Sequence, residues 1–555
     1  MLDLIYRRMF SKSAFRSLNV PMLAFAFVLA HLSGFAQQPF AIEVRPSAIT
    51  VMPEVHSGAF AKWDGKWIYI GGRSNGLHGF LPPSSFPFSN INDSVFVVDP
   101  QLNQRWSMSL ASLPDSLREP LLSSNMESFQ DSATLYMVGG YGWKTTQNNF
   151  ITFNTLTAVD LPGLLAAVMN NTPSQSLFRQ MSDSVLTVCG GHLERLGNTY
   201  QLVFGHNFNG FYSINSNGGF YSQQYTCEVR RFKIIDDGVN LSLQDYSALR
   251  DTDNFHRRDY NLVPQILLDE SYGLTAFSGV FQYYANLPYT GTVDIAETYA
   301  NPNTYFVQQF ANYHCAAMPL YNSASRKMST VFFGGMGMFF KDTVTRQLIC
   351  DTLVPFVNTI SVVDRDGLGQ VSETLLPASM PGYAGTNALF VVNDSLSLLH
   401  DAILDFQHLD TLVRAGYIIS GISSSDRNIS SINSTMSYAN GAVYEVWLKK
   451  IPQSPLSVDA ANANRLVEWS TFPNPASSVL NVSLNMPTSI VVDLDLLDLK
   501  GSRLKRYSLH QQVSEGKSCL TFNVSDLPAG NYICRMQAAG HTWARLVTIR
   551  PSLAK

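Results

Sequence analysis

The side chains best suited to chemistry are a scattered set of aromatic, basic and acidic residues in the middle of the chain. The set comprises Arg73, Trp143, His192, Glu194, Arg195, Tyr283 and Tyr284. Aromatic rings offer stacking area, while guanidinium, imidazole and carboxylate groups offer oriented hydrogen bonds. The mixture predicts contact with a ligand, such as a sugar ring stacked on an aromatic face with its hydroxyls held by polar groups. The alternative is that several of these side chains pack inside the fold.

Sequence patterns of catalytic and metal sites are incomplete in this chain. Gly72-Arg-Ser-Asn-Gly76 has the form G-x-S-x-G, but the proline-containing segment after it cannot begin the helix that a nucleophilic serine needs. Asp364-Arg-Asp-Gly-Leu-Gly369 starts like a calcium loop but has leucine at two required ligand positions. No CxxC pair occurs, and the eleven histidines show no metal-binding spacing. We therefore expect no catalytic residue, no metal and no cofactor.

The six cysteines do not suggest a disulfide framework. Cys519 and Cys534 flank one turn, but their alternation with apolar neighbours places Cys519 on the outer face of its strand and Cys534 on the inner face. Thiols on opposite faces cannot bridge easily. The other four, Cys189, Cys227, Cys315 and Cys350, are expected to pack as small apolar residues.

Composition limits the kinds of protein that this chain can be. Charged residues make up 14 % of the 555 positions, against about a quarter in an average soluble protein, and aromatic residues make up 12 %. The net charge of −4 argues against a nucleic-acid partner, which would require a basic field. The apolar content is high enough for a large core, so the chain is not disordered. Many short strands joined by polar turns fit this composition better than charged helices.

A short apolar strand that ends in glycine recurs six times between residues 50 and 450. The copies are 67–72, 135–140, 185–191, 274–279, 331–335 and 417–421. A second strand follows most copies, at 95–99, 150–153, 228–235, 359–364 and 443–447. Repeated sheets of this kind close into a β-propeller, an all-β fold. Six copies predict six blades, and strand 41–45 is expected to complete the last blade and close the ring.

The first copy resembles a Kelch repeat. Gly71-Gly72, Asp99-Pro100 and Trp106 stand where a Kelch motif has them, and the resemblance extends over roughly 50–450. The copies are about 70 residues apart, longer than the ~50 of a Kelch repeat. The surplus follows the glycine strands, at 73–94, 192–226, 280–305, 336–357 and 422–440. Equivalent loops of a propeller emerge on one face, so this face is the predicted binding face.

The last 85 residues have a different character. Alternating apolar residues predict a β-sandwich of about seven short strands. Ordered motifs, PNPA, DLKG and LPAGNY, resemble the C-terminal sorting domain of the type IX (Por) secretion system. The motif residues are Pro473, Asn474, Pro475, Asp498, Gly501, Leu527, Pro528, Gly530 and Tyr532. The resemblance implies export by the type IX machinery across the outer membrane, removal of this domain by the sorting protease, and often attachment to the cell surface.

The N-terminus has the pattern of a secretory signal peptide. Four basic residues precede a short apolar run, and small residues lead to a cleavage site between Ala36 and Gln37. No later segment reaches the ~20 apolar residues needed to span a bilayer as a helix. The expected organisation is a signal peptide at 1–36, a Kelch-like propeller at 37–452, a linker at 453–471 and a sorting domain at 472–555.

These expectations favour binding over catalysis. The leading hypothesis is a secreted or surface-attached protein whose propeller recognises glycan or protein ligands. The first alternative is a Kelch-type carbohydrate-active enzyme, because that family includes sugar oxidases and a mutarotase. An oxidase would need copper held by tyrosine and histidine, and a mutarotase would need an arginine and a carboxylate that converge in the central pocket. The second alternative is a structural component of a surface layer.

Overall fold

The computed structural model describes most of the chain after the predicted signal peptide. The described residues are 38–79, 82, 85–213, 220–342, 345, 347–428, 436–451, 468–486, 489–498, 503–538 and 541–550. The predicted cleavage site at Ala36 and Gln37, most of the predicted linker, and Gly501 of the sorting motif lie outside them. The chain divides into unit 1, residues 1–451, and unit 2, residues 452–555.

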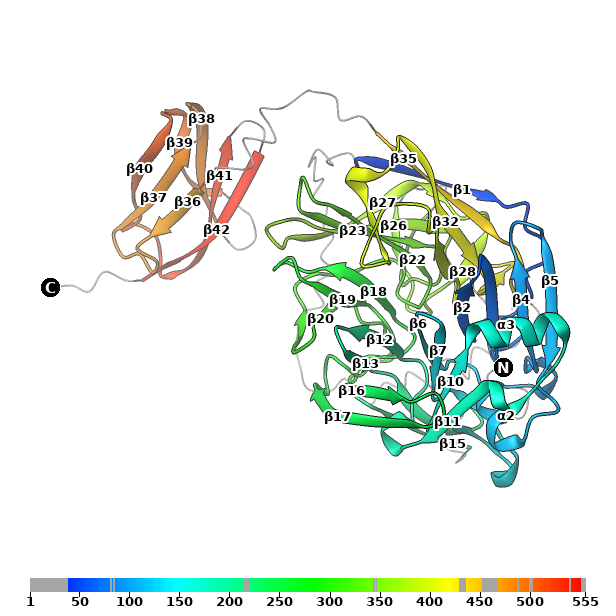
Figure 1. Ribbon diagram of the computed structural model, residues 1–555. Coiled ribbons are helices and arrows are strands. Elements are labelled where there is room, and N and C mark those ends of the chain that lie inside the picture. Colours follow the sequence, from blue (N-terminus) through cyan, green and yellow to red (C-terminus); the bar gives the residue numbers. More distant parts are fainter. Residues whose placement is uncertain are drawn as a thin grey trace. The chain divides into compact units, whose positions relative to one another are not determined.

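Unit 1 is an all-β propeller whose sheets are arranged around a common centre (Figure 1). Sheet one contains β2 (Ala59–Trp63), β3 (Lys66–Ile70), β4 (Ser94–Asp99) and β5 (Gln104–Ser109). Sheet two contains β6 (Glu127–Asp131), β7 (Thr134–Val138), β10 (Thr155–Asp160) and β11 (Phe178–Ser182). Sheet three contains β12 (His192–Leu196), β13 (Thr199–Val203), β16 (Glu228–Asp236) and β17 (Leu241–Arg250).

The remaining large sheets repeat this order of four antiparallel strands, and in sheet five β31 is added parallel to β22. Sheet four contains β18 (Asn261–Ile266), β19 (Tyr272–Phe277), β20 (Thr292–Ile295) and β21 (Ala300–Asn303). Sheet five contains β22 (Ala316–Asn322), β23 (Lys327–Phe333), β26 (Thr359–Arg365) and β27 (Val371–Ser379), with β31 (Ile403–Asp405) and β30 (Leu398–Leu399) added beside β22. Sheet six contains β29 (Leu389–Val392), β32 (Leu412–Ile419), β35 (Tyr444–Lys450) and β1 (Phe40–Pro46).

Strand β1 closes the ring as the sequence predicted. It pairs antiparallel with β35, from Phe40 opposite Lys450 to Pro46 opposite Tyr444. The first strand of the chain thereby becomes the outermost strand of the last sheet. The sheets confirm the propeller class, while the Kelch assignment and the number of blades stay predictions.

Small additional sheets lie at one end of unit 1, and all of their strands except β28, which precedes β29, follow the second strand of a large sheet. They are β8 (Tyr141–Lys144) with β9 (Asn149–Thr152), β14 (His206–Gly210) with β15 (Tyr221–Tyr225), β24 (Phe339–Lys341) with β25 (Leu348–Cys350), and β28 (Tyr383–Thr386) with β33 (Ile422–Ser424) and β34 (Ser437–Ala439). We call the end of unit 1 that carries them the hairpin face. The opposite end, where first and second strands are joined by short turns, is the turn face.

Helices are few and short in the described part of unit 1. The α-helices are α2 (Asp115–Leu121) and α3 (Leu161–Asn170), and the 3-10 turns are η1 (Phe88–Asn90), η2 (Thr145–Gln147), η3 (Gln175–Leu177), η4 (Ser184–Leu186) and η6 (Phe406–His408). Asp160 caps α3, because its side chain accepts a hydrogen bond of 2.9 Å from the backbone N–H of Gly163.

Five of the six predicted glycine strands coincide with second strands of the sheets, but the copy at 185–191 is wrong. Residues Ser184–Leu186 form the turn η4, in which the Asp183 carboxylate accepts from the N–H of Val185 at 3.0 Å. The second strand of sheet three is β13, and Gly205 follows it with φ of +80°. Residues 150–153, predicted as a blade strand, belong mainly to the small hairpin strand β9, and β10 takes the blade position. Both 185–188 and 199–203 contain apolar residues that favour strands. The Asp183 cap makes the first segment a turn, and pairing with β12 makes the second a strand.

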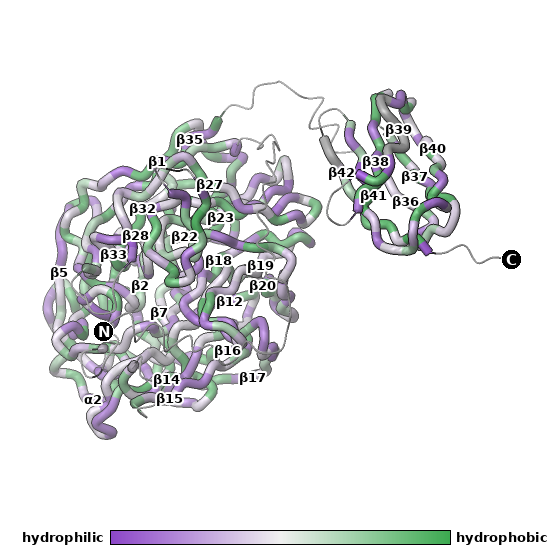
Figure 2. The backbone as a smooth tube through the Cα atoms, turned by 180° about the vertical axis from the view of Figure 1, so that it is seen from behind, coloured by the Kyte–Doolittle hydropathy of each residue, from purple (hydrophilic) through white to green (hydrophobic). Residues whose placement is uncertain are grey.

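The described part of unit 2 is a β-sandwich of seven strands. One sheet has the order β36 (Glu468–Phe472), β37 (Val479–Met486), β40 (Gly516–Asn523), and the other has the order β39 (Arg503–Val513), β38 (Ile490–Leu497), β41 (Gly530–Ala538), β42 (His541–Ile549). Alternate residues of both sheets fill its core, and hydrophobic and hydrophilic residues alternate at short intervals along the tube in Figure 2. Cys519 is exposed and Cys534 is buried, which confirms their predicted faces.

Candidate functional site

The loops before the first strand of each large sheet (β2, β6, β12, β18, β22 and β29), which we call the innermost strands, meet in a ring on the hairpin face. Each loop contributes one residue, and from the second loop on its backbone N–H donates to the carbonyl of the corresponding residue in the loop before it at 2.8–3.0 Å. The members are Ser57, Asn125, Gly190, Asp259, His314 and Asn387, one from the loop before each innermost strand. The side-chain amide of Asn387 donates to Ser57 Oγ at 3.0 Å, which joins the last member to the first. The ring brings together loops that are far apart in the sequence.

Backbone conformation explains the residue types in this ring. Asn125, Asp259 and Asn387 have φ between +49° and +54°, and Gly190 has φ of +69°. Asparagine, aspartate and glycine tolerate this left-handed region better than other residues. Because these residues are spread over the sequence without a common motif, the ring gave no signal that sequence reasoning could have used.

Arg258 and Asp259 form a charged pair at the ring. The guanidinium Nη1 lies 3.1 Å from the Asp259 carboxylate, and Nε donates to the hydroxyl of Tyr225 at 3.2 Å. Burial by itself would lower the pKa of Arg258, but Tyr225 and Asp259 hold it above its usual value. Arg258 therefore remains a cation, and 17 % of its side chain stays exposed.

A continuous line of side chains connects this pair with solvent. The ring of Tyr225 stacks on His256 with centroids 3.6 Å apart, and His256 meets Tyr283 edge-on at 5.3 Å. Tyr283 in turn contacts Tyr284 at 4.7 Å, and Tyr284 is 83 % exposed. We call Arg258, Tyr225, His256, Tyr283 and Tyr284 the tyrosine line. It links two residues predicted from sequence, Tyr283 and Tyr284, to three that sequence reasoning missed.

Buried histidines lie in and beside this ring of loops, and burial keeps them neutral. His192 lies 5.4 Å from His314 between ring centroids, and its Nε2 is 2.9 Å from the carbonyl of Tyr260. Burial lowers the pKa of His192 to about 4 and that of His314 to about 3. Burial also lowers the pKa of His56 and His78 to about 4. At neutral pH these imidazoles are hydrogen-bonding groups without charge. Within the described residues, no group of three or more potential ligands could hold a metal ion.

Trp143 belongs to an aromatic cluster on the hairpin face, formed by residues from the long connections of sheets one, two and three. Its ring contacts Phe88 at 4.7 Å, Phe150 at 5.4 Å and Phe211 at 6.5 Å between centroids. These partners come from three separate connections, so the cluster works as a second small core above the sheets. The indole is therefore placed mainly to pack, which was the alternative raised for this group of residues.

Arg73 is buried beside the same cluster. Its Nε donates to Asn75 at 3.0 Å, its Nη2 donates to the carbonyl of Pro87 at 2.6 Å, and its guanidinium lies 5.3 Å from the ring centroid of Phe86. Burial lowers the pKa of Arg73 to about 10. These contacts hold together the connection after β3.

Glu194 and Arg195 lie farther along β12, away from the tyrosine line. Arg195 forms an ion pair of 2.5 Å with Asp131 of β6, close to the turn face. Glu194 is the cross-strand neighbour of Gln201, and burial raises its pKa to about 8. These residues were predicted to lie in a loop because 185–191 was predicted to be a strand. The second strand of sheet three is β13 instead, so Glu194 and Arg195 lie in its first strand, β12.

Motif residues of unit 2 fasten its turns and its last strand. Asn474 donates to the carbonyl of Leu546 at 3.0 Å and accepts from the N–H of Thr548 at 2.8 Å. The hydroxyl of Tyr532 donates to the carbonyl of Pro528 at 2.6 Å. Outside the motifs, buried Asp495 pairs with Arg503 at 3.1 Å and with Arg535 at 2.5 Å. Asn474 and Tyr532 of the motifs are thus held by contacts within the sandwich.

A comparison with protein families matches residues 470–550 to the model described as "Secretion system C-terminal sorting domain". Residues 470–550 are a type IX sorting domain. The sorting domain directs secretion across the outer membrane to the cell surface or the extracellular space, and it implies interaction with the type IX machinery. In the described part of the chain, no helix is long and apolar enough to cross a membrane.

No curated protein matches the chain. Solved structures match it at low similarity, among them the following three. YjhT is 11 % identical, with a TM-score of 0.39 over 72 % of this chain and 99 % of its own. A glycoside hydrolase family 43 arabinoxylan arabinofuranohydrolase from Bacillus subtilis is 9 % identical, with a TM-score of 0.27 over 89 % and 96 %. Sucrose-6-phosphate hydrolase from Lactobacillus gasseri is 9 % identical, with a TM-score of 0.25 over 93 % and 90 %. These similarities are too low to transfer an activity.

Proposed function

We propose that the propeller is a glycan-binding module of the secreted protein and that it meets its ligand along the tyrosine line. The observation that carries the proposal is the unbroken contact from Arg258 to the exposed ring of Tyr284. Phenol rings offer flat stacking area, while the guanidinium and the Asp259 carboxylate offer a donor and an acceptor for hydroxyl groups. A pyranose presents an apolar face and a rim of hydroxyls, which matches this combination.

The point at which the chain leaves unit 1 supports binding at the hairpin face, because that point lies at the other end of the propeller. Strand β35 ends at Lys450 on the turn face, where the N–H of Ile451 donates to the carbonyl of Pro39 at 2.8 Å. The chain therefore leaves unit 1 from the end opposite to the hairpin face. Loss of the first 36 residues and of the sorting domain in the mature form is part of the proposal, as is attachment to the surface.

Replacement of Tyr284 by alanine tests the proposal in the secreted protein. Tyr284 is exposed, so we expect Tyr284→Ala to keep the melting temperature while it weakens glycan binding by about tenfold or more, as for a central aromatic contact. Tyr305 is the matched control, because it is 99 % exposed. A glycan array supplies the ligand and titration calorimetry the affinity. Equal losses in Tyr284→Ala and Tyr305→Ala, or no bound glycan, would contradict the proposal.

One observation favours a second candidate function. Arg258 and Asp259 converge near the centre of the propeller, which is the arrangement that a sugar mutarotase would need. Polarimetry or NMR of sugar anomers with the purified protein separates the two functions. Accelerated interconversion that disappears in Asp259→Asn would show catalysis, whereas binding without acceleration supports the binding module.

A further inference from the structure

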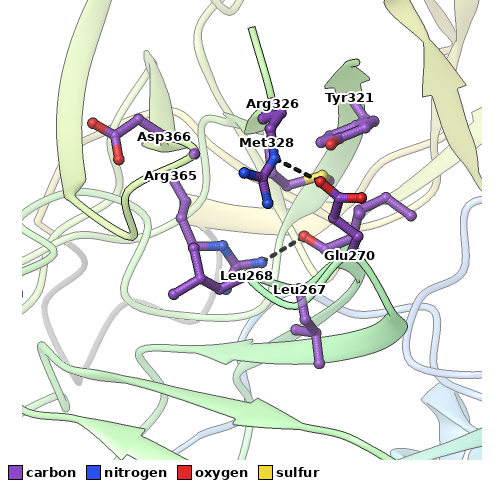
Figure 3. Close-up of a pocket in the computed structure, with 10 residues that line it drawn as sticks. Leu267, Leu268, Glu270, Tyr321, Arg326, Met328, Arg365 and Asp366 are labelled. Carbon is purple, nitrogen blue, oxygen red and sulfur yellow. Dashed lines mark hydrogen bonds and ion pairs between the residues drawn. The ribbon is translucent and has the colours of Figure 1, made fainter. Parts of the chain in front are cut away.

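The hollow between sheets four and five of unit 1 is too small to bind a ligand. It has room for about one water molecule, and an ion pair of 2.6 Å between Arg326 and Glu270 links its two sides (Figure 3). Its apolar lining residues Leu267 and Met328 are 4 % and 2 % exposed, so they belong to the core. An exposed surface that the proposed function does not use lies instead on unit 2.

One row of side chains crosses the outer face of the four-stranded sheet of unit 2. Its members are direct cross-strand neighbours, in the order Arg503 of β39, Leu497 of β38, Ile533 of β41 and Leu546 of β42. The three apolar members point away from the core, because the alternate residues of β38, β41 and β42 fill it. Exposure rises from 6 % at Leu497 to 57 % at Leu546. The row, which we call the outer row, therefore has a cationic end and an exposed apolar end.

A buried carboxylate holds two guanidinium groups at the cationic end of the outer row. Arg503 Nε lies 3.1 Å from Asp495 Oδ1, and Arg535 Nη2 lies 2.5 Å from Asp495 Oδ2. The Asp495 side chain is 1 % exposed, whereas those of Arg503 and Arg535 are 44 % and 26 % exposed, so the positive charges reach solvent and the negative charge does not. Asp493, the next carboxylate along β38, lies opposite Gln537, farther from the outer row. A guanidinium has five N–H donors, so both arginines keep donors for the oxygens of a partner.

From this arrangement we infer that the outer row and the two arginines are the surface by which the sorting domain docks on the type IX machinery. The machinery meets them with a segment that carries an acidic residue followed by apolar ones. It is the fitting occupant because residues 470–550 are a sorting domain, which implies interaction with the machinery. A carboxylate of the segment binds the guanidinium groups, and its apolar side chains cover Ile533 and Leu546. The opposite charges fix the direction of the segment along the row. Glycan binding by the propeller plays no part in this contact.

Export of the full chain in a bacterium with an active type IX system tests this surface. Antibodies against the propeller measure the fraction that reaches the cell surface or the medium and the fraction that stays in the periplasm. We expect Arg503→Gln and Leu546→Ser each to lower the exported fraction by about threefold or more, and Arg503→Lys, which keeps the charge, to lower it less. Matched controls lie on the other sheet, where Lys517→Gln removes an exposed cation of β40 and Val479→Ser removes an apolar side chain of β37 that is 38 % exposed. Both controls should be exported like wild type.

Crosslinking identifies the occupant of the surface. Photoreactive benzoylphenylalanine in place of Leu546 should crosslink to a protein of the type IX machinery, and in place of Val479 it should not. A crosslink from position 546 to a second copy of the chain would overturn the inference, and so would normal export of Arg503→Gln and Leu546→Ser. Binding of the purified full chain to phosphatidylglycerol vesicles that Arg503→Gln abolishes would overturn it in favour of a lipid surface. Arg535 stays paired with Asp495 in Arg503→Gln, so its melting temperature should match wild type, and if it does not, the exposed Leu546→Ser decides.

Discussion

The two faces of the propeller are built by different physical means. On the turn face, short connections are fixed by their own residues, as where Asp99 accepts from the N–H groups of Gln101 and Leu102 at 3.0 and 2.9 Å. On the hairpin face, connections are long and are fixed by partners from other sheets, as where Trp143 contacts Phe88 and Phe211. Residues within one turn are therefore sufficient to fix the connections of the turn face, whereas the connections of the hairpin face depend on contacts between sheets. Changes at the hairpin face should accordingly cost more stability than matched changes at the turn face.

The largest difference is expected for two glycines with positive φ. Gly72, on the hairpin face, has φ of +83°, and a Cβ there would lie 2.2 Å from the carbonyl oxygen of His56. Gly65, on the turn face, has φ of +71° and no atom within 4 Å of that position. We expect Gly72→Ala to lower the free energy of unfolding by about 3 kcal/mol or more and Gly65→Ala by about 1 kcal/mol. Urea unfolding measures both, and equal losses would contradict the comparison.

Buried ionisable groups at the hairpin face should make stability depend on pH in both directions. Burial raises the pKa of Glu127 to about 8, so its contribution is complete below pH 4.5 and is lost as pH rises through 8. The histidines have lowered pKa values, so their contribution is complete above pH 6.5 and is lost as pH falls towards 4. The melting temperature of the propeller should therefore be highest near neutral pH.

Glu127→Gln sharpens this expectation. Glu127 accepts from the N–H of Gly191 at 2.7 Å, and the amide oxygen of glutamine can keep that bond without ionising. The variant should retain the loss of stability at low pH, but between pH 4.5 and pH 8 its stability should fall by on the order of 3 kcal/mol less than that of the wild type. Melting curves from pH 4 to 9 check the result. An unchanged alkaline decline would assign it to other groups, such as Glu373, whose pKa burial also raises to about 8.

Trp143→Ala tests whether the aromatic cluster holds the hairpin face together. Loss of a partly buried indole with three aromatic contacts should cost about 2–3 kcal/mol. Trp143→Phe keeps stacking area and should cost less than half as much. Thermal unfolding of both variants provides the measurement. If Trp143→Ala instead unfolds like wild type and loses glycan binding, the residue contacts ligand and the cluster is not a core.

The smallest effect is expected at the turn face. Asp99→Ala removes the acceptor of two backbone N–H groups and should cost about 1 kcal/mol, whereas Asp99→Asn keeps that acceptor oxygen, loses only the 3.7 Å ion pair with Lys66, and should cost less. Neither variant should change glycan binding at the hairpin face. A loss of several kcal/mol in Asp99→Ala would show that this turn also depends on the assembled ring, which would weaken the comparison between the two faces.

Prediction from sequence was accurate where one strand or one motif carried its own signal. Five glycine strands, the closing strand β1 and the sorting domain at the C-terminus were recognised. The error at 185–191 arose because Val185 to Val188 have the composition of a strand, while the Asp183 cap and the pairing of β13 with β16 decide otherwise. Because of this one error, Glu194 and Arg195 were predicted to lie in a loop, although they lie in the innermost strand β12.

The sequence by itself determined the all-β class, the repeated apolar strands and the address for secretion. These properties depend on residues close together in the chain, so alternation and turn chemistry are enough to show them. Only the tertiary structure decided which side chains meet. Tyr225 and Arg258 are 33 residues apart, and Asn387 and Ser57 are 330 apart, yet each pair is joined by a hydrogen bond. Packing of sheet four beside sheet three brings Arg258 to Tyr225, and closure of the propeller brings Asn387 to Ser57, so no local sequence pattern encodes either contact.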